Sequence, residues 1–240
     1  MSSLSAYRKN LHSQNGEDGV LQEICARLGL KEGFFVEFGA WDGMHLSNTF
    51  RLLEDGWSGV YIEADTTKFQ DLTRNMKTYS GRVELINAFV EPEGKNRLDN
   101  LLLSTKAPQN FEVLSIDIDS CDWQIWHSLQ NYSPLIVVVE INSYIPVGIF
   151  QTHRGRAIQG SSFTSTLDLG NRKGYTAVCH TGNLIFVRNS HVSKLRLPES
   201  EILFPETLFD YSWKALSYEP AIVDPVSRIL RRLKRVIGKR

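Results

Sequence analysis

Short apolar runs and segments with helical spacing alternate along most of the chain. The run from Ile136 to Val139 is apolar at every position, which is typical of a central parallel strand with helices on both faces. Strands are expected at residues 34–38, 59–63, 83–87, 112–117 and 135–141. Helices are expected at residues 15–28, 47–55, 66–78, 97–103 and 121–131. This alternation predicts an α/β domain built on a parallel sheet.

Residues with capping side chains stand near several of the expected helix starts. They are Ser47, Thr66 or Thr67, and Ser120. The pattern changes toward the C-terminus, where residues 175–180 and 184–188 are strand-like runs joined by Thr181, Gly182 and Asn183. Two short strands joined by a Gly-Asn turn predict a β-hairpin. We expect residues 1–190 to form the main domain and residues 191–240 a C-terminal extension.

Length and composition are those of one ordinary globular domain. The chain has 240 residues, of which 42% are hydrophobic and 22% charged. The three cysteines, Cys25, Cys121 and Cys179, lack metal-ligand spacing, and their odd number favours a reducing environment. Residues 1–10 lack the apolar core of a signal peptide, and no apolar stretch is long enough to span a bilayer. A cytoplasmic location is expected.

The formal net charge of zero conceals a basic C-terminal segment. Residues 226–240 contain seven basic residues and no acid, which leaves twenty basic against 27 acidic residues in the rest of the chain. Apolar residues recur there at helical spacing, so a basic amphipathic helix is expected. Three interpretations stay open: packing of the apolar stripe on the domain, peripheral contact with an anionic membrane surface or a lipid-linked substrate, and contact with nucleic acid. The rest of the chain has no pattern of basic and aromatic residues that would indicate nucleic-acid binding.

Residues 36–43, Val-Glu-Phe-Gly-Ala-Trp-Asp-Gly, connect the first expected strand to the helix that follows. A strand that leads through a glycine turn into a helix is how open α/β sheets build a cofactor crevice. Glycines allow the backbone to approach a ligand closely. Glu37, Gly39 and Gly43 give the spacing Glu-x-Gly-x-x-x-Gly, which differs from the Gly-x-Gly-x-x-Gly of dinucleotide binders. The spacing therefore favours S-adenosylmethionine over a nicotinamide cofactor.

Several segments, taken in order, resemble the FkbM-like family of S-adenosylmethionine-dependent methyltransferases. They are residues 13–19 (Ser-Gln-Asn-Gly-Glu-Asp-Gly), residues 36–43, residues 114–119 (Leu-Ser-Ile-Asp-Ile-Asp), Gly174-Tyr175 and residues 183–187 (Asn-Leu-Ile-Phe-Val). The resemblance covers roughly residues 12–190. Ser120 departs from the pattern, because many relatives have glycine there, and this difference affects the turn that holds the neighbouring acids.

The resemblance implies a class I methyltransferase fold. This is a Rossmann-like, doubly wound α/β fold whose seven strands have the order 3-2-1-4-5-7-6, with an antiparallel last strand. The expected hairpin fits that plan by fold-level analogy. The resemblance also implies an O-methyltransferase acting on hydroxyl groups of sugars, polyketides or other secondary metabolites, and it does not determine the acceptor.

Cofactor contacts are expected where the first three strands end, because ligands bind there in open α/β sheets. Glu37 is expected to organise the methionine amino group or, alternatively, to cap the loop that follows it. Glu63 is expected to accept hydrogen bonds from both ribose hydroxyls, with Asp65 as the alternative. Asn87 and Ala88 are expected near the adenine.

The N-terminal polar segment adds further candidates. By resemblance, Gln14, Glu17 and Asp18 fold over the carboxylate of the cofactor. The alternative is a capped helix with an acidic first turn. The full expected set of cofactor-binding residues is Gln14, Glu17, Asp18, Glu37, Gly39, Ala40, Gly43, Glu63, Asn87, Ala88 and Asp117.

Asp117 and Asp119 are candidate catalytic bases at the end of the fourth strand. Both face the same side if the chain stays extended to residue 119. Methyl transfer is an in-line displacement at carbon, and a hydroxyl nucleophile needs a base to take its proton. Much of the rate can come from holding that hydroxyl in line with the methyl group. His153 is a third candidate base, since an imidazole titrates near neutral pH.

Acceptor contacts are expected from the segment that follows the fifth strand. Glu140 and Asn142 end that strand and are expected to contact the acceptor. Paired with Asp117 or Asp119 they form an oxygen-rich cluster that suits Mg²⁺, with Asp119 and Glu140 as the expected ligands. A metal-free mechanism with a general base is the alternative. Arg154 and Arg156 are expected to bind a phosphate or carboxylate of the acceptor, or else belong to a solvated loop.

Together these features predict an S-adenosylmethionine-dependent O-methyltransferase. The expected acceptor is a sugar hydroxyl or a surface glycan precursor in polysaccharide biosynthesis, and a lipid-carried glycan would suit the basic tail. Non-sugar secondary metabolites are the alternative acceptors. A nicotinamide-dependent oxidoreductase is disfavoured by the glycine spacing. A non-catalytic binding module is disfavoured because Glu37, Glu63, Asp117 and Asp119 are all present.

Overall fold

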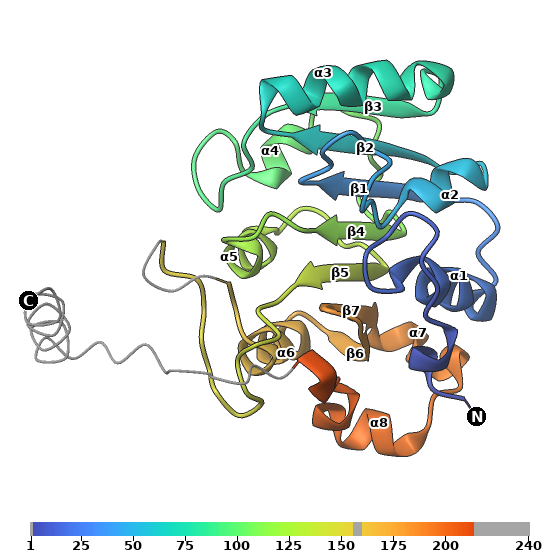
Figure 1. Cartoon of the computed structure of the whole chain (residues 1–240), viewed down its shortest axis with the longest axis vertical. Coiled ribbons are helices and arrows are strands. Elements are labelled where there is room, and N and C mark those ends of the chain that lie inside the picture. The colour runs from blue at the N-terminus through green and yellow to red at the C-terminus, as the bar shows by residue number, and fades with distance from the viewer. Residues whose placement is uncertain (1, 156–159, 214–240) are drawn as a thin grey trace, which may run out of the picture.

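A seven-stranded sheet forms the centre of the protein (Figure 1). The computed structural model describes residues 2–155 and 160–213, and the sheet has the strand order β3-β2-β1-β4-β5-β7-β6. β7 is antiparallel to both of its neighbours, and the other pairings are parallel. The predicted fold is therefore confirmed. The strands are β1 (Phe34–Phe38), β2 (Ser58–Glu63), β3 (Val83–Asn87), β4 (Val113–Ile116), β5 (Ile136–Glu140), β6 (Tyr175–His180) and β7 (Asn183–Arg188).

Helices cover both faces of the sheet. Apolar side chains of α1, α2, α3 and α7 pack on one face, and those of α4, α5 and α6 pack on the other. The α-helices are α1 (Glu17–Leu28), α2 (Phe50–Glu54), α3 (Thr66–Asn75), α4 (Leu98–Leu102), α5 (Asp122–Ser128), α6 (Phe163–Arg172), α7 (Asn189–Leu195) and α8 (Glu199–Leu203). The 3₁₀ turns are η1 (Leu4–Tyr7), η2 (Met76–Tyr79), η3 (Pro205–Leu208) and η4 (Tyr211–Trp213).

The uniformly apolar run in β5 is explained by its two buried faces. Ile136 and Val138 belong to the core under α1, whereas Val137 and Val139 belong to the core under α5 and α6. All four side chains are fully buried. Because successive side chains of a strand point to opposite faces, a strand covered on both sides needs apolar residues at every position.

Helix α6 is an element that the sequence pattern did not predict. Its first turn is rich in Ser and Thr, which have low helix propensity, and Gly170 interrupts its apolar stripe. Ser162 caps the helix by accepting a hydrogen bond from the backbone N–H of Ser165. Gly170 allows close packing, since a Cβ there would lie 2.2 Å from the ring of Phe186. Tertiary contact with β7 outweighs local propensity in this helix.

The described part of the C-terminal segment packs on the sheet. Val192, Leu195 and Leu197 join the core under α1, and Phe209 is buried against Phe163 and His180. Helix α8 contacts the edge strand β6 (Figure 1). The expected basic helix within residues 226–240 lies outside the described residues. Within residues 2–155 and 160–213, no helix has the length and hydropathy needed to cross a membrane.

Several predicted boundaries need correction. Asp65, not Thr66 or Thr67, caps α3, because its carboxylate accepts the backbone N–H groups of Thr67 and Lys68. Helix α2 begins at Phe50 rather than at residue 47. The cap position of α5 is Cys121 rather than Ser120, and no side chain caps it. The elements themselves are placed correctly, and the errors are of one to three residues, which is where hydrogen bonding rather than periodicity decides.

Candidate functional site

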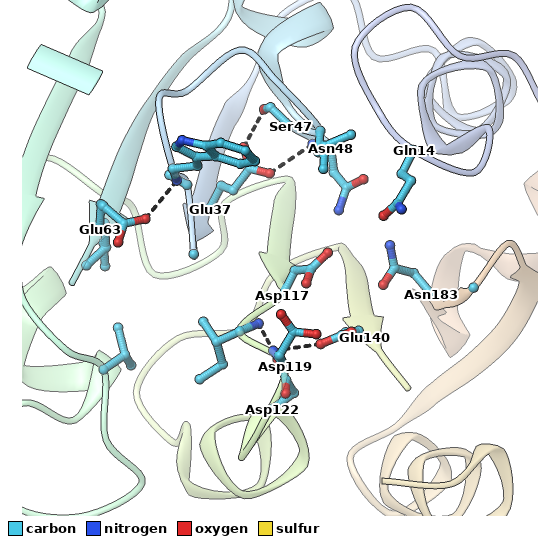
Figure 2. A pocket seen from close by; sticks show the side chains of 18 of the residues that line it. Gln14, Glu37, Ser47, Asn48, Glu63, Asp117, Asp119, Asp122, Glu140 and Asn183 are labelled. Carbon is cyan, nitrogen blue, oxygen red and sulfur yellow. Dashed lines mark hydrogen bonds between the residues drawn. The ribbon is translucent and has the colours of Figure 1, made fainter. Parts of the chain in front are cut away.

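A cavity of about 770 Å³ opens at the carboxyl ends of the strands. The loops that follow β1 to β5 line it, together with the turn between β6 and β7 (Figure 2). The strand order reverses between β1 and β4, so the connections leave the sheet on opposite sides there. Such a switch point creates the crevice in which open α/β sheets bind ligands.

Residues at the ends of neighbouring strands lie in one row across this edge. The pairing register places Glu63 opposite Asn87, and Glu140 opposite Asn183. Extending the registers of β1 with β2 and β4, and of β4 with β5, by one residue places Gly39 beside Glu63 and Asp117, and Asp117 beside Glu140. From β3 to β7 the row reads Asn87, Glu63, Gly39, Asp117, Glu140 and Asn183, and all of these except Asn87 line the cavity.

Glu37 is the penultimate residue of β1, and its carboxylate is buried against the loop that follows the strand. Oε2 accepts hydrogen bonds from the hydroxyls of Ser47 (2.6 Å) and Thr49 (2.7 Å), and Oε1 accepts one from the backbone N–H of Asn48 (2.8 Å). Burial raises the pKa of Glu37, and these three hydrogen bonds oppose that rise. The carboxylate therefore holds the loop in shape, which is the alternative role considered for it. Oε1 keeps acceptor capacity for a ligand.

Glu63 ends β2 and lines the cavity on the other side of the glycine loop (Figure 2). Oε2 accepts the backbone N–H of Trp41 at 2.8 Å, and Oε1 accepts that of Asp65 at 2.7 Å. Each oxygen therefore retains a lone pair that can accept from a ligand. The carboxylate of Asp65 caps α3 and does not line the cavity, so this alternative to Glu63 is not supported.

The two glycines of the loop make different contacts. Both have φ of +78°. A Cβ on Gly39 would lie 1.8 Å from the carbonyl oxygen of Asp117, so the glycine is required where β1 meets β4. A Cβ on Gly43 would meet Leu72 at 2.6 Å and Met76 at 2.8 Å, and Gly43 does not line the cavity. Packing of the loop against α3, rather than a ligand, explains Gly43, whereas Gly39 and Ala40 do line the cavity.

Among the N-terminal candidates, Gln14 lines the cavity, whereas Glu17 and Asp18 do not. Oε1 of Glu17 accepts a hydrogen bond from Nδ2 of Asn183 (3.1 Å). Oδ2 of Asp18 accepts the backbone N–H groups of residues 11–13 at 2.7 to 2.8 Å. Both acids are buried and fix the start of α1, so their contacts are those of the acidic first turn considered as the alternative.

Carboxylates gather where β4 and β5 end (Figure 2). The backbone N–H of Asp119 donates to Oε2 of Glu140 at 2.7 Å. Asp122 accepts the backbone N–H groups of Ile118 and Ser120, both at 2.9 Å. Burial, followed by repulsion from the neighbouring acids, raises the pKa of Asp117 to about 8 and that of Glu140 to about 10. Burial also raises the pKa of Asp122 to about 6.

Asp117 and Asp119 are not equivalent. β4 ends at Ile116, and Asp119 has φ of +57°, so the chain is not extended to residue 119. The condition under which alternation would place both carboxylates on one side is therefore not met. Asp117 is half-buried at the centre of the row, whereas Asp119 is exposed on the turn, and both line the cavity.

Of the two residues expected near the adenine, one lines the cavity and the other does not. Ala88 lines the cavity together with Phe89 and Val90. Asn87 is exposed and outside the lining, because its Nδ2 donates to the backbone oxygen of Glu63 at 2.8 Å. Asn87 therefore joins β3 to β2 instead of facing a ligand.

The segment after β5 contributes less than expected. Asn142 lines the cavity, but His153 and Arg154 do not. The ring Nδ1 of His153 accepts the backbone N–H of Gly160 at 3.2 Å, so this side chain closes its own loop. Arg154 is exposed, and Arg156 lies outside the described residues.

The expected magnesium site is not supported. Among the residues that the structure describes, no group of three or more His, Cys, Asp or Glu side chains could hold a metal ion. Glu140 accepts a hydrogen bond from the backbone of Asp119 with one of its two oxygens, which ties the pair together without a cation.

Asn48 and Asn183 are cavity residues that the sequence pattern assigns only to a helix start and a turn. Asn48 is 3% exposed, and its Nδ2 donates to Oγ of Ser115 at 3.0 Å. Asn183 is 5% exposed and faces Glu140 across the β5–β7 pair. The signal that could have found Asn183 is its position opposite an acid at a strand end, which requires knowledge of the pairing register.

Large apolar side chains surround the mouth of the cavity. Trp41, Leu46, Phe89 and Tyr144 line it and are 43% to 57% exposed. Nζ of Lys68 lies 5.0 Å from the ring centroid of Trp41. Exposed apolar groups gathered at one opening indicate a binding surface.

A buried histidine links the cavity to the C-terminal segment. Nδ1 of His180 accepts the backbone N–H of Asp210 at 2.9 Å, so in the neutral ring Nε2 carries the proton. Nε2 lies 2.9 Å from Oγ of Ser143, a cavity residue. Burial, followed by the charge of Arg8, lowers the pKa of His180 to about 4. The ring therefore stays neutral at physiological pH and holds residues 143 and 210 together.

Comparison with known proteins adds structural matches of low identity. No family model matches the chain, and no curated protein matches it. A structure from Staphylococcus aureus, provisionally assigned as a caffeoyl-CoA O-methyltransferase, is 14% identical, with a TM-score of 0.48 and coverage of 78% of this chain and 91% of that chain. The [4+2]-cyclase SpnF is 15% identical, with a TM-score of 0.45 and coverage of 71% and 63%.

A third match is an S-adenosylmethionine-dependent methyltransferase from Clostridium acetobutylicum. It is 5% identical, with a TM-score of 0.41 and coverage of 70% of this chain and 89% of that chain. At these levels the matches identify neither a family nor an activity. The resemblance to the FkbM-like family stays a prediction, and the strand order and the cavity are what any functional conclusion rests on.

Proposed function

We propose that the protein is an S-adenosylmethionine-dependent methyltransferase that methylates a hydroxyl group. The preferred acceptor in this proposal is a sugar or a surface glycan precursor. The observation that carries this proposal is Glu63. It stands at the end of β2 beside the Gly39 loop, lines the cavity, and has one protein donor on each carboxylate oxygen. A carboxylate in that position with two free acceptor sites matches the vicinal hydroxyls of a ribose.

The other cavity residues supply suitable surroundings for such a cofactor. Ala88, Phe89 and Val90 give an apolar surface for an adenine ring beyond the ribose. Across the glycine loop from Glu63, Oε1 of Glu37 and the amide oxygen of the buried Asn48 side chain supply acceptors for an ammonium group. Hydrogen bonds between charged partners are about twice as strong as neutral ones, so these acceptors would favour the amino-acid end of the molecule.

The chemistry needs a hydroxyl held in line with the methyl group and a base for its proton. Asp117 is the proposed base, because it lies at the centre of the row and lines the cavity. The raised pKa of about 8 makes its carboxylate a stronger base than an ordinary aspartate once it is ionised. Asp119, exposed on the turn, is the second candidate.

The acceptor would enter between the apolar groups at the mouth. Trp41 and Tyr144 offer flat apolar faces on which a sugar ring or another ring system can pack. The alternative acceptor, a non-sugar secondary metabolite, would use the same faces. Residues 226–240 are proposed to hold the enzyme near a membrane-bound glycan. Unchanged sedimentation with anionic vesicles after deletion of residues 226–240 would contradict that role.

Calorimetric titration with S-adenosylmethionine and S-adenosylhomocysteine tests the proposal. We expect micromolar binding by the native protein and a loss of about tenfold or more for Glu63→Gln, which keeps the side-chain shape but replaces an acceptor oxygen with a donor. Asp71→Asn is the control, because Asp71 lies on α3 and pairs with Arg74 outside the cavity. Absence of binding by the native protein would overturn the proposal. Tight binding without methyl transfer to any acceptor would instead indicate a binding module.

A further inference from the structure

The cavity has an uneven distribution of charge. Of the described residues that line it, six are carboxylates, and Lys68 and His45 are the basic side chains; the carboxylates are Glu37, Glu63, Asp117, Asp119, Asp122 and Glu140. Lys68 lies over the ring of Trp41, in the part of the cavity near Glu63. In the described parts of the chain, no lysine or arginine therefore accompanies the acids at the ends of β4 and β5.

The acids at that end differ in how far protein donors satisfy them. Asp122 accepts two backbone N–H groups, and Glu37 accepts three hydrogen bonds. Within residues 2–155 and 160–213, Glu140 accepts a single donor, on Oε2, and the carboxylate of Asp117 accepts none. Their free oxygens lie in neighbouring positions of the row, where a ligand could bridge them.

A buried amide supplies an independent observation at the same place. Asn183 is 5% exposed and lies opposite Glu140 in the β5–β7 pair, so both side chains project from the same face of the sheet. Its Nδ2 donates to Oε1 of Glu17, a carboxylate oxygen that also accepts from the hydroxyl of Thr181. A carboxylate requires donors, so the amide orientation is fixed and Oδ1 faces away from Glu17.

Oδ1 of Asn183 receives no hydrogen bond from the described residues and belongs to the cavity wall. This carbonyl oxygen can accept a hydrogen bond from a ligand or a water in the cavity. Neighbouring carboxylates at Asp117 and Glu140 make a donor with positive charge the most favourable occupant. Burial and mutual repulsion raise the pKa values of both acids, which is the cost that a bound cation would relieve.

We propose that Asp117, Glu140 and Asn183 form a subsite for a compact organic cation. Two sources carry the positive charge, the sulfonium of S-adenosylmethionine and an ammonium group on the acceptor, and the ammonium alone also supplies N–H donors for Oδ1 of Asn183. The first source rests on the proposed function, and the second does not require it. The subsite favours amine-bearing acceptors and disfavours phosphate-bearing ones, because a phosphate would face the same carboxylates. It also distinguishes the charged cofactor from its neutral product.

Two titrations test the subsite and separate its sources. The first compares S-adenosylmethionine with S-adenosylhomocysteine in the native protein, Glu140→Gln and Asp117→Asn, with Asp71→Asn as the control. We expect the native protein and the control to prefer the sulfonium by about tenfold, and each cavity variant to reduce that preference to about threefold or less. Both cavity variants nearly preserve side-chain shape, and thermal unfolding checks that they are folded.

The second titration compares glucosamine with glucose, which differ in one ammonium group, using the free protein and the protein saturated with S-adenosylhomocysteine. Binding of glucosamine at least about threefold tighter than glucose, lost in Glu140→Gln, supports the acceptor as the source. A sulfonium preference without an ammonium preference supports the cofactor. The absence of both preferences, or preferences equal in the native protein and both cavity variants, overturns the subsite. Failure of the nucleoside ligands to bind at all would count against the proposed function, and the sugar pair would still decide the subsite.

Discussion

Replacing Gly39 with alanine measures how closely the loop after β1 approaches β4. The added methyl carbon would lie 1.8 Å from the carbonyl oxygen of Asp117 and 3.1 Å from Cγ2 of Ile118. Residue 39 also has φ of +78°, a conformation that costs alanine about 1 kcal/mol more than glycine. Relief of the contact requires movement of backbone rather than of a flexible side chain, which adds about 1–3 kcal/mol. We expect the free energy of unfolding to fall by about 2–4 kcal/mol.

Gly29 provides the matched control for this substitution. It ends α1 with φ of +75°, and no atom lies within 4 Å of the position of an added Cβ. Gly29→Ala should therefore lower the free energy of unfolding only by the conformational cost, about 1 kcal/mol. Urea unfolding followed by tryptophan fluorescence gives both free energies. The dependence of the free energy of unfolding on urea concentration is compared between the variants to exclude a change in the unfolded state. Equal losses in the two variants would refute the claim that contact with Asp117 requires glycine at residue 39.

Further predictions concern titration and cofactor affinity. The value of kcat/KM for S-adenosylmethionine should rise about tenfold per pH unit below about 8 and level off above it, because kcat/KM reports the free enzyme and the ionised form of Asp117 takes the proton; a flat profile would remove Asp117 as the base. The contribution of His180 to the free energy of unfolding should fall by about 3 kcal/mol between pH 6.5 and 4, because the unfolded chain protonates His180 near pH 6.5 and the folded chain near 4. The raised pKa values of Asp117, Asp122 and Glu140 act in the opposite direction, so this contribution is read in urea titrations as the difference between the native protein and His180→Gln, and an equal pH dependence of the two would contradict it. Glu63→Gln should weaken the binding of S-adenosylhomocysteine by about 1.4 kcal/mol or more, measured by calorimetry, and an unaltered affinity would exclude the ribose contact.

Much of the fold was accessible from hydrophobic periodicity. All seven strands were expected within a residue or so of their observed ends, because buried parallel strands are apolar at nearly every position. The strand order came from the resemblance rather than from periodicity, and the structure confirms it. Helix α6 was missed, since Ser, Thr and Gly170 hide a helix that packing against Phe186 stabilises.

Position at a strand end identified part of the site from the sequence. Glu63 and Asp117 line the cavity for that reason, and the resemblance added Gln14, which also lines the cavity. Gly43 could not be distinguished from Gly39 by sequence, because both have positive φ and only the packing partners differ. The exact role of Glu37 depends on hydroxyls in the next loop, and Asn183 depends on pairing between strands that are distant in sequence.

The row across the sheet also determines when the binding edge comes into existence during folding. Its central neighbours, at the ends of β1 and β4, are separated by two other strands in the chain, so their pairing closes a long loop. A shift of one residue in any of these pairings would turn that strand's member of the row to the opposite face. A molecule that spans the row can therefore bind only the fully registered sheet, and its free energy of binding stabilises the native state as a whole. Growth of thermal stability with ligand concentration would then report the register of the entire sheet rather than local order at one loop.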